Sequence, residues 1–432
     1  MSFLKTLLRT SIYTFTLIWC STALAQSTSS PYSRIGLGEL RGLPNPQFRG
    51  IGGVSTGVRT LGGMYNINSS NPASYSSIHL TTFDFGLFGS YDQLNQGEIK
   101  QNNGNFALGH INFGIPITQQ SAMSFGINPY SSVGYRYTNT MQLDTTSYDQ
   151  ISSGKGGLTK AYIGYGIQFG KHISVGFNVG YLFGNLYNNQ EADFAGIPGA
   201  LNTKWENRTS VYGLTYDYGI QYSTNLNSEL SMTLGYSGNA GSELKSKNYQ
   251  TIFRTLGTSS SDRAVTGLDS TEYIEGAIQS VKMPLTHSFG VSINRGTQWL
   301  IGADAYHGTW SDLSIGGVNQ GLNDRTGIAV GAQYTPDISA LNYFSLVDYR
   351  LGLRYDKTQV KVSDQDINEI AITLGFGFPL PSTRNSTFHK INISAELGQR
   401  GTTSHNLVKE NFINVHLGFT LNDRWFQRYK YD

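Results

Sequence analysis

The chain has 432 residues, of which 38% are hydrophobic, 14% charged and 12% aromatic, and its 31 basic residues nearly balance 29 acidic ones. Soluble domains carry about 25% charged residues and disordered chains contain few aromatics, so this composition excludes both classes. After residue 25 no apolar stretch approaches the roughly 18 residues of a membrane-spanning helix, which excludes a helical membrane protein. The remaining class is an all-β protein rich in Gly, Tyr, Ser, Thr and Asn.

Residues 1–25 are typical of a secretory signal peptide. Lys5 and Arg9 form a basic region, an apolar stretch follows, and Ala23-Leu24-Ala25 is a small-x-small cleavage site. Cleavage after Ala25 removes two basic residues, so the mature chain of 407 residues has 29 basic and 29 acidic residues. A charge near zero gives no electrostatic reason for binding nucleic acid.

The only cysteine, Cys20, lies within this leader. An alternative is that Cys20 is the acylated residue of a lipoprotein, but that signal needs a small residue before the cysteine and Trp19 is large. Removal of the leader leaves a chain without cysteine, which excludes disulfides and thiolate metal sites.

Residues 26–77 are dense in Gly, Ser, Pro and Asn, with scattered apolar side chains such as Phe48 and Met64 and no sustained period. Disordered tails are poorer in apolar residues. About 50 ordered but irregular residues in front of the strands described next predict a plug inside a barrel.

Two patterns raise the question of catalysis. Residues 53–57 read Gly-Val-Ser-Thr-Gly and match a nucleophile motif, but that motif needs a strand–turn–helix context that a Gly-rich plug does not offer. The eight histidines show no close metal-ligand spacing, so we expect no metal and no other cofactor. A serine and a histidine that meet across strands stay open as an alternative; our prediction is a protein without enzymatic activity.

Residues 78–421 are predicted to form the barrel, because fourteen segments alternate apolar and polar residues with a period of two. In the last of them Ile413, Val415 and Leu417 alternate with Asn414, His416 and Gly418. Runs of about 9 to 13 residues match a membrane-spanning strand rather than the five or six residues usual in soluble sheets. The predicted strands are 79–92, 105–117, 121–137, 157–170, 172–187, 207–224, 229–251, 280–294, 298–311, 325–336, 344–357, 367–379, 387–399 and 410–421.

The links between these segments alternate in length. Short links such as 119–120 and 225–228 are followed by longer, more polar ones, namely 93–104, 138–156, 188–206, 252–279, 312–324, 358–366 and 400–409. Short turns on one side and long loops on the other indicate an outer-membrane barrel with both termini on the periplasmic side. A secreted β-sandwich is the alternative, but it explains neither the strand length nor this alternation.

The third predicted strand is interrupted at Asn128, Pro129 and Tyr130, after which Val133, Tyr135 and Tyr137 resume the alternation. Proline has no N–H to donate to a ladder, so it marks a bulge or a break. Unpaired backbone at membrane depth is tolerated only against protein or water, which a gap filled by plug residues provides. Asn128, Pro129 and Tyr130 therefore predict a lateral opening; the alternative is a proline at the rim, where pairing has already ended.

Residues 422–432 form an aromatic and basic tail that includes Trp425, Phe426 and Tyr429. Aromatic rings mixed with cations suit the membrane interface, where the rings lie at headgroup level. Docking to a periplasmic or membrane partner is the alternative.

The segment from Asn68 to Tyr75, which contains Asn71, Pro72 and Ala73, resembles the Asn-Pro-Ala plug motif of the FadL family of outer-membrane channels. More specifically, the chain resembles the FadL-like proteins common in the Bacteroidota. Further similar segments are 30–38, 128–135, 396–401 and 421–426. The resemblance implies a 14-stranded barrel with an N-terminal hatch that passes fatty acids or aromatics to an opening in the wall. It also implies that Asn71, Pro72, Ala73 and Tyr75, together with Phe48 and Met64, form the plug and ligand site. Two departures are the residues that follow the last strand and the absence of an external pocket that can be aligned.

Two functions follow. The first is passive uptake of hydrophobic small molecules, with outer-membrane lipid and the ligand as partners. The second is a non-transporting accessory subunit of an outer-membrane assembly or secretion machine, whose partners are other outer-membrane or periplasmic proteins.

Overall fold

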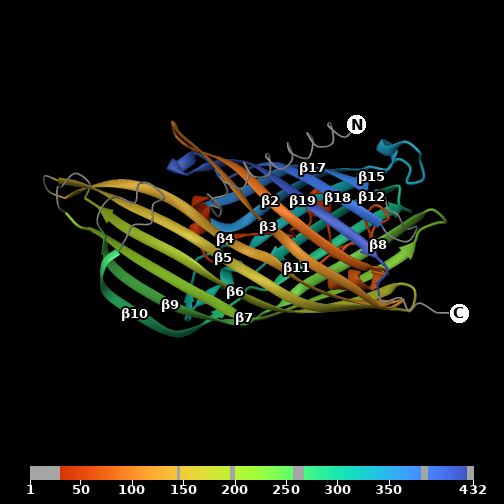
Figure 1. Cartoon of the computed structure of the whole chain (residues 1–432), viewed down its shortest axis with the longest axis horizontal. Coiled ribbons are helices and arrows are strands. Elements are labelled where there is room, and N and C mark those ends of the chain that lie inside the picture. Colours follow the sequence, from red (N-terminus) through yellow and green to blue (C-terminus); the bar gives the residue numbers. More distant parts are fainter. Residues whose placement is uncertain (1–29, 144–145, 195–199, 256–266, 381–387, 426–432) are drawn as a thin grey trace, which may run out of the picture.

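The computed structural model describes residues 30–143, 146–194, 200–255, 267–380 and 388–425. They form a closed antiparallel β-barrel of fourteen strands, elongated along one axis (Figure 1). Closure is made by the last and first wall strands, which pair from Lys409 opposite Asn95 to Asp423 opposite Thr81. The predicted fold class is confirmed. The predicted signal peptide lies outside the described residues, as do Phe426 and Tyr429.

The wall strands follow the predicted order, and two of the fourteen are broken once along their length. The wall consists of β2 (Thr81–Gln96), β3 (Ile99–Thr118), β4 (Ser121–Leu143), β5 (Thr146–Phe169), β6 (Ile173–Asp193), β7 (Asn202–Asn225), β8 (Leu230–Ala240) continued by β9 (Glu243–Thr255), β10 (Gly267–Lys282) continued by β11 (Thr286–Arg295), β12 (Trp299–Gly308), β15 (Arg325–Tyr334), β16 (Asp348–Val362), β17 (Gln365–Leu380), β18 (Phe388–Arg400) and β19 (Lys409–Asp423). The second break contains Pro284, which cannot donate to a ladder.

The period-two pattern turns one apolar face outward around the barrel. Ile370 and Ile372 are 53% and 49% exposed, while Ala371 and Thr373 between them are buried. Because the exposed side chains are large and apolar, this belt is suited to lipid and not to water. Among the described residues no helix is long and apolar enough to cross a membrane.

Most of the predicted long loops are strand instead. Residues 138–156 continue β4 to Leu143 and begin β5 at Thr146, and residues 188–206 extend β6 and β7 in the same way. The last strand also reaches Asp423, past the predicted boundary at 421. Outside the belt the strands are mostly polar, so apolar and polar residues do not alternate there. The strands could therefore be predicted from the sequence only where they face lipid.

These extensions make one side of the barrel much taller than the other. The upper parts of β4 to β7, together with β9 and β10, form a projecting sheet (Figure 1). Its described residues are 128–143, 146–160, 185–193, 202–212, 243–255 and 267–282. A strand of 24 residues such as β7 spans about 80 Å at ~3.3 Å per residue, more than twice the 9 to 11 residues that cross a bilayer.

The N-terminal segment packs against inward-facing side chains around the barrel. It contains η1 (Pro31–Arg34), β1 (Glu39–Leu40), α2 (Pro46–Arg49) and η2 (Pro72–Ser77). Its hydrogen-bond partners include Asp84 on β2, Asn178 on β6 and Asp304 on β12. The remaining short elements are η3 (Trp310–Asp312), β13 (Ser314–Ile315), β14 (Val318–Asn319), η4 (Tyr343–Ser345) and η5 (Ser404–Asn406).

One predicted orientation is wrong. A bulge between Pro129 and Ser131 adds a residue to β4 and inverts the parity of the strand above it. Val133 and Tyr135 are therefore 3% and 8% exposed and point inward, where the outward alternation was predicted to resume. Inside, they pack in an apolar cluster that also contains Leu37.

Candidate functional site

The wall forks between β3 and β4. These strands pair from Thr118 opposite Ser121 up to Ile111 opposite Ile127, and no further pairing between them occurs in the described residues. Above that level β3 continues beside β2, and β4 continues beside β5 as far as Leu143 opposite Thr146. The fork therefore leaves two strand edges facing each other without a shared ladder.

Both strands are irregular where they part. On β4 the bulge at Pro129 removes one backbone donor and turns the strand, since proline carries no N–H. On β3 the register with β2 shifts between Gly86 and Leu87, next to His110. The pairing of β3 with β4 thus ends at the level where β4 has a bulge and β3 has a register shift.

The N-terminal segment occupies the edge of β4 that β3 has left. Glu39 and Leu40 pair antiparallel with Ser132 and Ser131. The Arg41 backbone N–H donates to the Tyr130 carbonyl oxygen at 2.9 Å. β1 is thus a two-residue substitute for the missing neighbour.

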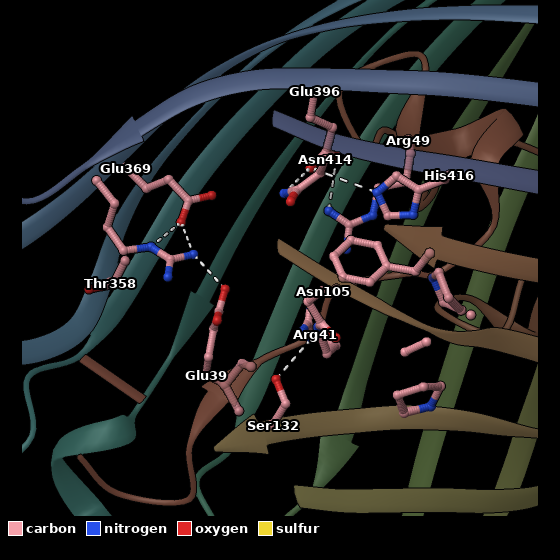
Figure 2. A pocket seen from close by; sticks show the side chains of 18 of the residues that line it. Glu39, Arg41, Arg49, Asn105, Ser132, Thr358, Glu369, Glu396, Asn414 and His416 are labelled. Carbon is pink, nitrogen blue, oxygen red and sulfur yellow. Dashed lines mark hydrogen bonds and ion pairs between the residues drawn. The ribbon is translucent and has the colours of Figure 1, made fainter. Parts of the chain in front are cut away.

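A cavity of about 160 Å³ lies at this fork. One side is formed by β2, β3, β4 and the N-terminal segment, with Leu40, Pro44, Phe88, Ala107, Leu108, Gly109, Pro129 and Ser132 among its lining residues. Figure 2 shows Arg41 directed at Ser132 on this side, with Arg49, Glu396 and His416 gathered away from it. The cavity therefore has an apolar side next to the fork and a charged side next to β16 to β19.

The charged side is a ladder of ion pairs. Arg400 contacts Glu39 at 2.8 Å and Glu369 at 2.6 Å, while Arg354 contacts Glu369 at 2.7 Å. Arg49 of α2 contacts Glu396 at 3.1 Å. Each cation has a carboxylate within reach, as buried charges require.

Glu39 connects this ladder to the strand edge. Burial alone would raise the pKa of its carboxyl, but the nearby Arg400 and Arg41 guanidinium groups together hold that pKa below its ordinary range. Arg41 itself donates from Nε to the Ser132 hydroxyl at 3.0 Å and lies over the Phe88 ring at 4.4 Å. At neutral pH β1 is therefore held to both sides of the cavity by ionised groups.

The predicted plug motif lies elsewhere, against β5, β6 and β7. The Asn71 side chain caps η2 by accepting from the Ala73 N–H and donates to the Thr56 carbonyl oxygen at 2.8 Å. Tyr75 is fully buried and donates its hydroxyl to Asn178 Oδ1 at 3.0 Å. Pro72 approaches the wall so closely that a Cβ at Gly176 would lie 2.4 Å from its carbonyl group.

The other predicted site residues are divided between the two regions. Phe48 lies in a buried apolar cluster beside β12 and β15, and Met64 is buried in a turn near the barrel wall. Pro129 lines the cavity, Asn128 donates to the Ser69 hydroxyl at 3.3 Å, and Tyr130 packs against the apolar cluster with Leu37. Trp425 is 51% exposed next to the end of β19.

The charged residues of the cavity were not predicted. The sequence does contain a pattern that could have indicated them. In β16 to β19 charged side chains recur at the positions between the lipid-facing apolar residues, and these positions face the lumen. Residues 53–57, which match the nucleophile motif, form turns and irregular backbone after α2, with no strand directly before them and no helix directly after them. The backbone N–H groups of Ser55 and Thr56 donate to Asp304, which is an anchoring contact.

The family model that matches this chain, over residues 7–432, is described as BamG. None of the curated proteins compared matches the sequence. Among solved structures, the Pseudomonas putida toluene transporter TodX is similar at 16% identity and TM-score 0.59, covering 90% of this chain and 100% of its own. The Ralstonia pickettii toluene transporter TbuX is similar at 14% identity and TM-score 0.60, covering 89% of this chain and 99% of its own. A Pseudomonas aeruginosa FadL homologue is similar at 12% identity and TM-score 0.57, covering 90% of this chain and 100% of its own. At these identities the likeness establishes the FadL-like fold.

Proposed function

The chain belongs to the BamG family, and we propose that it is an outer-membrane channel of the FadL type for passive uptake of hydrophobic small molecules such as fatty acids and aromatics. Its structural neighbours include the toluene transporter TodX and the monoaromatic hydrocarbon channel CymD, which supports this class of ligand. The predicted signal peptide at 1–25 and the alternation of short and long hairpins support an orientation with the projecting sheet outside the cell.

The observation that carries the proposal is the fork between β3 and β4 with a cavity at its base. In a closed barrel the ladder shields the lumen from lipid, so a small apolar molecule can leave sideways only where that ladder is interrupted. The cavity meets the fork through Ala107, Leu108 and Pro129, which are apolar. A hydrophobic molecule can thus pass from the lumen to the bilayer core without entering water.

In this mechanism the segment 26–77 is the hatch. Its lower part, from Asn71 to Tyr75, is packed tightly against the wall and serves as the anchor, with Phe48 and Met64 buried beside other parts of the wall. Its upper part, β1, covers the fork and is the element that has to move when a ligand passes. No step requires an enzyme or a cofactor.

The test is to close the fork and measure uptake. Pro129→Val restores a backbone N–H and a β-branched residue at the break, and Ala107→Trp fills the apolar side of the cavity. We expect each variant to reduce uptake of a radiolabelled aromatic or fatty acid by cells several-fold at unchanged surface abundance. Pro116→Val is the matched control, since Pro116 lies opposite Ala122 where β3 and β4 are already paired. Unchanged uptake in both fork variants would refute a lateral route.

A second candidate function is the accessory subunit of an outer-membrane assembly or secretion machine. The closed upper lumen favours it: Leu37 packs with Trp310, Leu313 and Leu322 in one buried cluster, which obstructs direct entry from above. Purification from native membrane followed by mass spectrometry separates the two functions. Stoichiometric protein partners, together with normal uptake and impaired secretion in the fork variants, would refute the channel function and support the accessory-subunit function.

A further inference from the structure

The outward face of the projecting sheet carries cations stacked on aromatic rings. The Arg208 guanidinium lies 4.2 Å from the Tyr249 ring centroid, and the Lys155 ammonium lies 5.4 Å from that of Tyr187. Lys247 also lies over Tyr249, and Lys204 over Phe253, each at 5.4 Å. Such pairs hold a cation in place without neutralising its charge.

Four of these residues form one continuous row across the strands. Lys155 is opposite Tyr187, Tyr187 is opposite Arg208, and Arg208 is opposite Tyr249. We call these four residues the cation–aromatic row. Cross-strand neighbours on one face lie about 4.5 to 5.5 Å apart, so the row is a compact strip and not a set of scattered surface charges.

The row lies on the lipid-facing side of the sheet. The pairing of β5 with β6 and of β6 with β7 runs without a shift through this region, so parity is preserved along each strand. Arg208 is therefore on the same face as Leu214, and Lys155 on the same face as Ile163, both of which belong to the exposed apolar belt. Small polar residues separate row and belt, where Ser210 donates to Asn185 at 2.5 Å.

Its height places the row at the outer headgroups of the bilayer. Tyr187 is fourteen residues above the lower end of β6 at Ile173, and Arg208 is seventeen above the lower end of β7 at Asn225. At ~3.3 Å per residue and a tilt of ~45°, these positions are about 33 to 40 Å above the short turns. Given an apolar band about 25 Å tall, the row lies just outside the hydrocarbon.

Carboxylates do not neutralise the row. Within the part of the chain that the structure describes, Lys155, Lys204 and Arg208 form no ion pair within 4.0 Å. The carboxylates on this face include Glu275, which is paired with Lys247, Glu206, which lies between Lys204 and Arg208, and Glu191, which is opposite Lys204. On β16 and β17, at the opposite side of the barrel, Lys357 is paired with Asp366 at 2.9 Å and Lys361 with Asp364 at 2.8 Å. The cations of the cation–aromatic row thus differ from Lys357 and Lys361, whose charges are balanced by carboxylates.

We propose that the cation–aromatic row binds the phosphate groups of a phosphorylated glycolipid of the outer leaflet. The phosphates supply the anions that Lys155 and Arg208 lack, while the acyl chains lie on the apolar belt directly below. This assignment rests on the proposed membrane orientation but not on transport. Lipid bound here would hold the projecting sheet upright against the membrane surface.

The test uses the full-length protein in detergent, titrated with diphosphoryl lipid A and followed by native mass spectrometry. Charges near an anionic surface contribute about 1 kcal/mol each, so we expect the loss of two charges in Lys155→Gln with Arg208→Gln to weaken lipid A binding about 30-fold. The matched control, Lys357→Gln with Lys361→Gln, should bind like the parent protein. A second variant, Tyr187→Leu with Tyr249→Leu, keeps the charges. It should still bind lipid A several-fold more weakly, because the aromatic rings that hold the cations in place are removed.

Three outcomes would overturn the proposal: unchanged binding in the row variants, equal loss in the control, or displacement of the lipid by inorganic phosphate at the same concentration. Orientation is measured separately, with an epitope inserted in 252–279 or at 225–228 and labelled on intact cells. Labelling only at 225–228 would reverse the orientation and thereby remove the membrane setting of the row. Uptake by the row variants should equal that of the parent, so a failure of the channel proposal is not confused with a failure of this one.

Discussion

The lower and upper halves of the barrel hold the N-terminal segment by different chemistry. Below the fork, η2 is close-packed against glycines of the wall, and its polar groups bond to neutral partners such as Asn178. Above the fork, β1 is a two-residue strand held by Glu39 to Arg400 and by Arg41 to Ser132. Close packing leaves no room for a second arrangement, whereas ion pairs at a cavity can be exchanged for other charged or hydrated partners. We therefore expect the lower half to be the anchor and the upper half to be the movable part.

The largest effect is expected from breaking the anchor. Tyr75→Ala removes a fully buried ring and its bond to Asn178, which should cost about 3 to 5 kcal/mol of local stability. Hydrogen exchange followed by mass spectrometry should show faster exchange over residues 68–78, while the wall strands stay protected because their ladders do not depend on the hatch. Equal loss of protection throughout the barrel would show that the two halves are not independent.

An intermediate effect is expected in the belt that surrounds the anchor. Val179→Arg places a charge among lipid-facing side chains and should cost about 2 to 4 kcal/mol, visible as a lower yield of heat-resistant folded barrel. Gln190→Arg is the control, since Gln190 is exposed on the same strand beyond the belt. Asn178 cannot serve as an inward control, because it is 2% exposed and bonded to Tyr75. Comparable yields for the two arginine variants would place the membrane elsewhere on β6.

The smallest effect is expected in the upper half. Glu39→Gln weakens the ion pair with Arg400 and should cost about 1 to 2 kcal/mol, with faster exchange confined to residues 38–42. Because the folded state lowers the pKa of the Glu39 carboxyl, its contribution is complete above the ordinary glutamate range and is lost as the pH falls through the lowered value. The parent protein should therefore release β1 on acidification, and the variant should show a weaker pH response. Identical pH profiles would mean that other contacts hold β1.

The barrel could be predicted because its signal is local. Lipid imposes alternation on every strand that crosses it, so the outward residues, the number of strands and the pairing of neighbours follow from short stretches such as 370–378 and 413–421. The same reasoning failed where that constraint ends: the strands continue past the belt as polar hairpins, and one added residue at the bulge after Pro129 inverts the face of Val133 and Tyr135.

The sequence by itself determined an all-β barrel with an apolar exterior, an irregular N-terminal segment and a break at Pro129. Only the tertiary structure decided what fills that break, because Glu39 meets Arg400 from 361 positions away, and no local pattern records a contact between such distant residues. The same holds for the cation–aromatic row, whose members come from four strands and become neighbours only through the register of the sheet. A period along the chain specifies which face a residue occupies, whereas its neighbours on that face depend on closure of the whole barrel.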